Sequence, residues 1–120
     1  MKRILIVDDQ KGIRMLLEEV FKREGFITFL ASKGSEALQL IEKEKIDCVL
    51  LDMKLSGEDG KEVLKKMKAL QPDLPVFVMT AFDDEEMKKE TKTFGAVHYF
   101  VKPFNIYEVK DAVGKVLLND

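Results

Sequence analysis

The sequence lacks the features that mark secreted, membrane-bound or nucleic-acid-binding proteins. It has one cysteine, Cys48, which cannot form an internal disulfide and which we expect to pack as a small hydrophobic side chain. No apolar run approaches the length of a membrane span, and the first residues lead into a predicted strand without signal-peptide architecture. A net charge of -2 provides no concentrated basic face for nucleic acid. We therefore expect a cytoplasmic protein that binds neither membrane nor nucleic acid.

The sequence also has no linker, internal repeat or low-complexity stretch that would divide it. Its 120 residues are 46% hydrophobic and 35% charged, which is typical of a globular chain that buries a core. We predict one domain over residues 1–120.

The main pattern of the sequence is an alternation of short apolar runs with amphipathic segments. Apolar positions at helical spacing, such as Ile13, Leu17 and Phe21, separate the runs. Such alternation predicts an α/β fold, a doubly wound parallel sheet of five strands with helices on both faces. The predicted strands cover residues 4–7, 26–31, 48–51, 76–79 and 96–101.

The strand order follows from right-handed crossovers and from the acidic residues. Asp9 and Asp52 can meet only if the first and third strands are neighbours, as in the flavodoxin-like order 2-1-3-4-5. The second strand then lies at an edge of the sheet.

Local signals mark several helices. Asp59 with Glu62, and Asn105 with Glu108, have the spacing of capping boxes at the start of two helices. The segment 83–95 has mainly Met87 and Phe94 as apolar anchors, so its helix should be marginal.

Four of the five apolar runs end at a reactive polar residue. The first ends at Asp8 and Asp9, the third at Asp52, the fourth at Thr80 and the fifth at Lys102. In a parallel sheet these ends emerge at one edge, where open α/β sheets bind ligands. The pattern therefore predicts one cleft with three carboxylates, a hydroxyl and an ammonium group.

The chemistry of this cleft requires a cation. Two carboxylates about 4 Å apart repel by roughly 4 kcal/mol at an effective dielectric constant near 20. Oxygen ligands without a nearby Cys or His favour a hard divalent ion such as Mg²⁺, which also coordinates phosphate. Asp52 is then a candidate nucleophile for an aspartyl-phosphate, with Thr80 and Lys102 as partners of the phosphoryl oxygens.

The whole chain resembles the receiver domains of two-component response regulators. The resemblance rests on ILIVDD at 4–9, LLDMKLSGEDG at 50–60, MTA at 79–81 and KPF at 102–104. It implies Asp52 as phosphoacceptor, Asp9 as a direct Mg²⁺ ligand, Asp8 as support for the metal, the Lys54 backbone carbonyl as a further ligand, Thr80 and Lys102 as phosphoryl contacts, Tyr99 as an aromatic switch, and a cis Lys102-Pro103 bond.

Within this family the chain is most similar to the single-domain regulators of sporulation phosphorelays, through VDDQKGIR at 7–14 and LLDMK at 50–54. That similarity implies an intermediate of phosphoryl transfer with slow autodephosphorylation, rather than a conventional enzyme. Its expected partners are a histidine kinase, a histidine phosphotransferase and an aspartyl-phosphate phosphatase. Ser56, Glu58 and Phe82 depart from the usual pattern and put loop conformation and dephosphorylation rate in question.

Three alternative functions remain at this stage. A chemotaxis-type receiver would bind a target when phosphorylated instead of passing the group on. A haloacid-dehalogenase-type phosphatase would need Asp-x-Asp after the first strand, and a flavodoxin-like FMN carrier would need a hydroxyl- and glycine-rich phosphate loop, whereas this chain has Asp-Asp-Gln-Lys-Gly.

A relay protein must also expose a surface for its histidine partners beside the acidic cleft. We expect the first turn of the first helix and the segment after Lys102 to contribute to it. The candidate partner-binding residues are Gln10, Gly12, Ile13, Arg14, Leu16, Phe82, Pro103 and Phe104.

Overall fold

The structure, a computed structural model, describes residues 1–118 and has a parallel sheet at its centre. Its five strands lie in the order β2-β1-β3-β6-β7, which confirms the predicted winding with β2 at an edge. The strands are β1 Arg3–Val7, β2 Ile27–Ala31, β3 Cys48–Asp52, β6 Val76–Thr80 and β7 His98–Val101.

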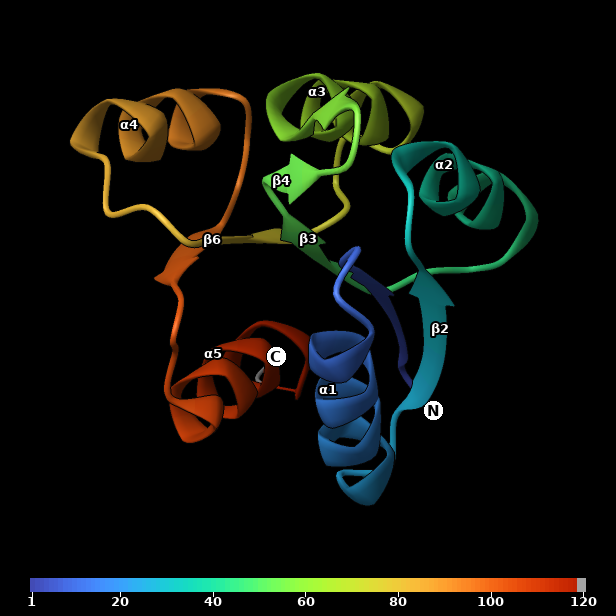
Figure 1. Cartoon of the computed structure of the whole chain (residues 1–120). Coiled ribbons are helices and arrows are strands. Elements are labelled where there is room, and N and C mark those ends of the chain that lie inside the picture. The colour runs from blue at the N-terminus through green and yellow to red at the C-terminus, as the bar shows by residue number, and fades with distance from the viewer. Residues whose placement is uncertain (119–120) are drawn as a thin grey trace.

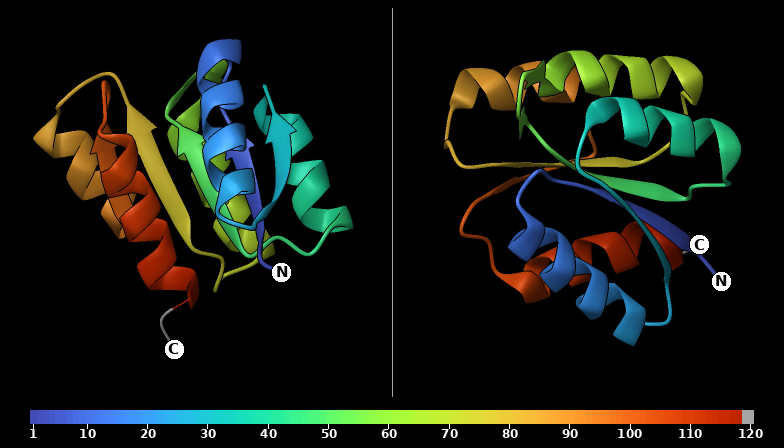
Figure 2. Two further views of the ribbon diagram at one scale, coloured as in Figure 1. Left: turned by 90° about the horizontal axis from the view of Figure 1, so that it is seen from below. Right: turned by 45° about the vertical axis from the view of Figure 1, so that its right-hand side comes forward.

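Helices cover both faces of the sheet (Figures 1 and 2). Below the sheet in Figure 1 lie α1 Lys11–Arg23 and α5 Ile106–Leu118, and above it lie α2 Gly34–Lys43, α3 Gly60–Leu70 and α4 Glu85–Thr93. Successive strand residues point to opposite faces. Ile4 and Ile6 of β1 therefore pack with α1 and α5, while Leu5 and Val7 pack in the cluster that contains α2 and α3. The central strands are buried on both sides, which explains their continuous apolar runs.

Each strand differs from its prediction at one end by one or two residues. The first strand begins at Arg3, the second at Ile27 and the last at His98, while the third and fourth extend by one residue to Asp52 and Thr80. Two short strands, β4 Lys54–Leu55 and β5 Glu58–Asp59, form an antiparallel hairpin that was not predicted. A two-residue strand is too short to show a periodic pattern, and Gly57 with φ 72° provides its turn.

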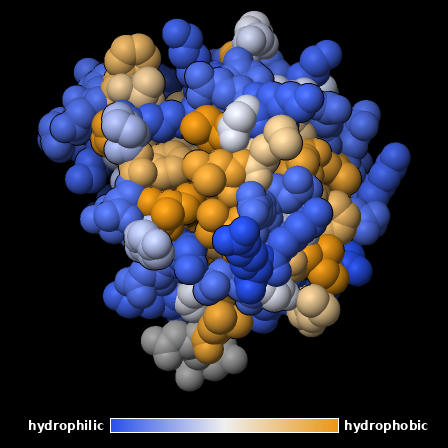
Figure 3. All heavy atoms as spheres, turned by 60° about the horizontal axis from the view of Figure 1, so that its bottom comes forward, coloured by the Kyte–Doolittle hydropathy of each residue, from blue (hydrophilic) through white to orange (hydrophobic). Residues whose placement is uncertain are grey.

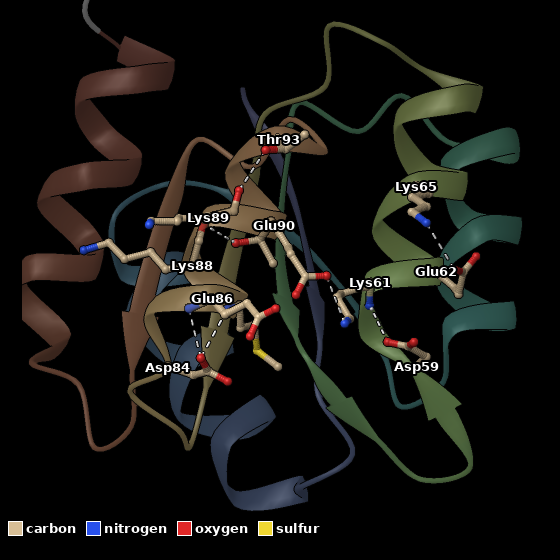
Figure 4. Close-up of polar contacts among 12 residues, drawn as sticks. Asp59, Lys61, Glu62, Lys65, Asp84, Glu86, Lys88, Lys89, Glu90 and Thr93 are labelled. Atoms are coloured by element: carbon tan, nitrogen blue, oxygen red, sulfur yellow. Dashed lines mark hydrogen bonds and ion pairs between the residues drawn. The ribbon is translucent and has the colours of Figure 1, made fainter.

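The start of α3 confirms only half of the predicted capping box (Figure 4). The Asp59 carboxylate accepts a hydrogen bond from the Lys61 amide at 2.9 Å, but Glu62 pairs with Lys65 at 3.3 Å instead of returning to the Asp59 amide. Lys61 also forms an ion pair with Glu90 of α4 at 3.2 Å. The helix start is thus fixed by one side-chain cap and by a link to its neighbour.

The start of α5 shows the same result. The Asn105 side chain accepts from the Tyr107 amide at 2.8 Å, whereas Glu108 forms no side-chain bond among the described contacts.

The helix α4 has few buried side chains. Met87 and Phe94 are partly buried against the core, as predicted, and Thr91 is the only fully buried residue of this helix. The Thr91 hydroxyl can be buried because it donates to the Lys88 carbonyl. Asp84 caps the helix by accepting from the amides of Glu86 and Met87 (Figure 4).

The outer surfaces of α1 and α5 carry apolar side chains. Figure 3 is turned so that this side of the molecule comes forward, and it shows hydrophobic atoms exposed across its middle. The exposed apolar residues of these helices include Met15 and Leu16 of α1 and Val116 of α5. Within residues 1–118, no helix is long and apolar enough to cross a membrane.

Candidate functional site

Three carboxylates converge at the carboxyl edge of the sheet, as predicted. Neighbouring strands β1 and β3 are in register with Val7 opposite Leu51, so Asp8 and Asp52 follow at the same level. One carboxylate oxygen from each of Asp8, Asp9 and Asp52 lies within 4.8 Å of the others. Asp8 and Asp52 are buried, whereas Asp9 is half-buried at the mouth of the site. The backbone order alone thus brings three acidic groups together.

Lys102 provides the positive charge of the site. Its Nζ lies 2.9 Å from Asp8 Oδ2 and 3.4 Å from Asp52 Oδ2, and it donates to Gln10 Oε1 at 3.2 Å. Among the described ion pairs, Lys102 is the one cation paired with this cluster of three carboxylates, so two negative charges would remain uncompensated if all three were ionised. A divalent cation would balance this excess.

The local environment makes Asp52 a weak acid. Burial disfavours its charged form and the neighbouring Asp8 adds repulsion, while Lys102 partly offsets both effects. Together they raise the pKa of the Asp52 carboxyl to about 6. A carboxylate with a raised pKa is more basic than an ordinary one, which suits a nucleophile. A bound cation would favour its ionised form.

This raised pKa predicts a pH-dependent stability. The folded state holds the Asp52 proton up to a higher pH than the unfolded chain does. The stabilisation of the folded state by protonated Asp52 is therefore complete below about pH 4 and is lost as pH rises through 6. We expect the Asp52→Asn variant to be more stable than wild type at pH 7.5 without Mg²⁺, by on the order of 2 kcal/mol. The difference should shrink towards pH 5. Urea denaturation at both pH values measures it, and a difference independent of pH would contradict the assignment.

Thr80, Phe82 and Tyr99 form a connected group beside the carboxylates. Thr80 ends β6 and is buried, and its Oγ1 accepts from the Phe82 amide at 3.2 Å. The Tyr99 hydroxyl donates to the Phe82 carbonyl at 2.9 Å. Phe82 itself is exposed, and the Lys54 ammonium lies 5.8 Å from the centre of its ring. The hydroxyl, the exposed ring and the aromatic residue of β7 are therefore coupled through one loop.

The structure reveals site contacts that sequence reasoning missed. Ser56 Oγ donates to Asp9 Oδ2 at 2.8 Å, and the Arg14 guanidinium donates to the Asp8 carbonyl at 2.6 Å. The Lys54 amide donates to Asp52 Oδ1 at 3.2 Å. Ser56 stood out in the sequence only as a departure from the usual loop pattern.

Gly60 is also required by close packing that the sequence did not reveal. A Cβ at this position would lie 2.5 Å from the Met53 Cα and against its carbonyl. Met53, which follows Asp52, can therefore pack against the start of α3 only if residue 60 has no side chain.

The predicted partner surface is partly exposed. Gln10, Gly12, Leu16, Phe82 and Pro103 are exposed, and a Cβ at Gly12 would meet nothing within 4 Å. Ile13 and Phe104 are half-buried against the cluster of α1 and α5, and Arg14 is half-buried by its bond to Asp8. Leu16, at 47% exposure, is the apolar residue of this group on α1 that is most available to a partner, and the exposed Met15 beside it was not predicted.

The donor set fits a hard divalent cation. The three converging ligands are all carboxylates, and no Cys or His joins the cluster within the described residues. The predicted cis peptide between Lys102 and Pro103 is present.

Residues 4–114 match the family model described as the response regulator receiver domain. This chain belongs to that family. Membership decides against the phosphatase and the flavin carrier considered from the sequence. It also agrees with the sheet order and with the acidic residues at the ends of β1 and β3.

Two curated relatives differ in length. The chain is 52% identical over 116 residues to sporulation initiation phosphotransferase F of Bacillus subtilis, covering 97% of this chain and 94% of the relative. It is 39% identical to the alkaline phosphatase synthesis transcriptional regulatory protein PhoP of the same organism, covering 97% of this chain but only 48% of that protein. The receiver is thus closely related to a sporulation phosphorelay regulator of similar length.

Solved structures of receiver proteins superpose closely. A receiver domain protein from Methanospirillum hungatei has a TM-score of 0.93 at 31% identity, covering 98% of this chain and 94% of that one. The response regulator TrrA from Thermotoga maritima, determined in complex with Mg(2+)-BeF, has a TM-score of 0.88 at 36% identity, covering 98% and 100%.

Proposed function

We propose that this chain is a single receiver domain over residues 1–120 that accepts a phosphoryl group from the phosphohistidine of a histidine kinase onto Asp52 and passes it to a histidine phosphotransferase. The observation that carries the proposal is the Asp52 carboxylate, buried between Asp8 and Lys102 at the carboxyl edge of the sheet. The 52% identity of the chain to a sporulation phosphotransferase supports the relay role. A cytoplasmic location and a phosphatase that removes the group from Asp52 belong to the same proposal.

The proposed step is a displacement at phosphorus. An Asp52 carboxylate oxygen attacks the phosphorus atom, the bond from phosphorus to the imidazole nitrogen breaks, and the histidine ring leaves with the electron pair. Lys102, which now bridges two carboxylates, would move its charge to the phosphoryl oxygens, and the Thr80 hydroxyl would donate to one of them. Asp8, Asp9, Asp52 and the Lys54 carbonyl would hold Mg²⁺, which when bound neutralises charge on the transferring group.

Mg²⁺ should stabilise the folded protein because it binds the carboxylate cluster in the native state only. We expect the free energy of unfolding to rise by about 1.4 kcal/mol for each tenfold increase of Mg²⁺ above its dissociation constant. Thermal denaturation across a Mg²⁺ series measures the effect. Asp9→Ala should remove most of the shift. Asp73→Ala should leave it intact, because Asp73 is exposed and precedes β6, at the amino end of the strands and away from the carboxylate cluster. A shift equal in both variants would indicate binding elsewhere.

The relay also requires a docking surface beside Asp52. Leu16 is exposed on α1, the helix that follows Asp8 and Asp9, so Leu16→Ala should slow phosphoryl transfer from a histidine kinase by about tenfold, the cost of losing one apolar anchor. Labelling by a small acyl-phosphate donor should not change. Radiolabel transfer measured with both donors tests this prediction.

Leu70→Ala is the matched control for Leu16→Ala. Leu70 is 46% exposed, against 47% for Leu16. It is the last residue of α3, at the opposite end of this helix from the β4–β5 loop that contacts the site. Equal loss of transfer in both variants, or loss of both labelling routes in Leu16→Ala, would contradict a docking role for α1.

A further inference from the structure

The β4–β5 hairpin between Asp52 and α3 is tied to two other parts of the molecule by side chains that depart from the usual receiver pattern. Ser56, in the turn of the hairpin, donates to Asp9 Oδ2 at 2.8 Å. Glu58, in β5, accepts from the Gly34 amide at 2.9 Å through Oε1. The hairpin therefore connects the end of β1 to the start of α2.

The Glu58 carboxylate packs closely against Gly34. A Cβ on Gly34 would lie 2.5 Å from Glu58 Oε2, so the carboxylate occupies the space left by the missing side chain. The N-cap residue of α2, Lys33, makes no side-chain cap bond, and Glu58 supplies the acceptor from a distant segment. A negative charge at a helix start is also favoured by the helix dipole.

The Ser56 hydroxyl donates a hydrogen bond to Asp9, an acidic residue of the site. Asp9 is the only half-buried member of the carboxylate cluster, and the described hydrogen bonds give its side chain one partner, the Ser56 hydroxyl. A carboxylate has lone pairs on two oxygens, so Oδ2 can keep this bond while Oδ1 faces an ion. Hydrogen bonds of this kind orient a ligand and strengthen metal binding.

We propose that Ser56 is a positioning residue for divalent metal, holding Asp9 in its ligating orientation, and that Glu58 fixes the hairpin so that the Ser56 hydroxyl reaches Asp9. The inference rests on the proposed function, since it assigns metal binding to the same cluster. It predicts that the serine hydroxyl and the glutamate oxygen, rather than the bulk of either side chain, determine the affinity for Mg²⁺.

The test is calorimetric measurement of the Mg²⁺ dissociation constant in the unphosphorylated protein. Ser56→Ala should weaken binding by about tenfold, the lower end of the range for residues that orient metal ligands. Ser56→Thr, which keeps a hydroxyl, should restore affinity to within about twofold of wild type on the same ground. Ser35→Ala is the matched control, because Ser35 is exposed in the first turn of α2 and has no described side-chain bond.

Glu58 variants separate its role from a general loss of stability. Glu58→Met should weaken Mg²⁺ binding several-fold, Glu58→Gln should weaken it less because it keeps an acceptor oxygen, and Glu58→Met should add little to Ser56→Ala if both act through one hydrogen bond. Fully additive effects would overturn the role of Glu58, and equal affinity of Ser56→Ala and wild type would overturn the role of Ser56. Absence of Mg²⁺ binding by wild type would instead overturn the proposed function, and this inference with it.

Discussion

Asp52→Asn is expected to abolish labelling of the protein by a small acyl-phosphate donor, with a loss of about a thousandfold or more because the attacking carboxylate oxygen is removed. The amide keeps the shape of the side chain and removes a buried charge beside Asp8, so the fold should be retained. Radiolabel incorporation with Mg²⁺ present measures the loss, and circular dichroism checks the fold.

Asp73→Asn is the control for this substitution, since Asp73 is an exposed residue in the loop between α3 and β6. It should be labelled like wild type. Stoichiometric labelling of Asp52→Asn would show that another side chain accepts the phosphoryl group, and the proposed chemistry would be wrong.

Gly60→Ala is expected to have the largest effect on stability, because its Cβ would meet the backbone of Met53. Backbone atoms cannot move aside as the end of a flexible side chain can, so we expect a loss of about 3 kcal/mol, the upper part of the usual range for overpacking. The affinity for Mg²⁺ should fall as well, since the displaced segment begins directly after Asp52. Urea denaturation and calorimetry measure the two effects.

Gly114→Ala provides the matched comparison for Gly60→Ala. Gly114 lies inside α5, and a Cβ there would meet nothing within 4 Å. The substitution should stabilise the protein by about 1 kcal/mol, the difference in helix propensity between glycine and alanine. If the two glycine variants changed stability by the same amount and in the same direction, close approach of Met53 to Gly60 could not be the cause.

The sequence was sufficient to predict the sheet order and the main carboxylate cluster. Strand order follows from alternation and handedness, and the reactive residues directly follow apolar runs, so both signals are local in the chain. The position of Asp8 and Asp52 at one level then results from the register of β1 and β3.

Contacts between distant segments were not predictable in the same way. The bonds from Ser56 to Asp9 and from Gly34 to Glu58 join residues 47 and 24 positions apart, and they depend on a hairpin whose strands have only two residues each. The capping boxes show a related limit, because Glu62 has the correct spacing but finds a closer partner in Lys65. Spacing identifies which residues can interact, while tertiary packing decides which of them do.

Half-burial of Ile13 and Phe104 has the same origin. Ile13 follows the acidic residues closely in the sequence and Phe104 follows Lys102 and Pro103, which suggested exposure, but the cluster between α1 and α5 takes up much of both side chains. Leu16 is turned further from this cluster and keeps nearly half of its surface exposed.

The most direct test of the account is to follow the phosphoryl group itself. The radiolabelled protein, phosphorylated on Asp52 and freed of donor, is mixed with a purified histidine phosphotransferase, and the label on each protein is measured over time. We predict that label leaves this chain and appears on the histidine protein in equal amount, and that a phosphotransferase with its histidine replaced by alanine receives none. Label that remains on this chain, or is released only as inorganic phosphate, would contradict a relay.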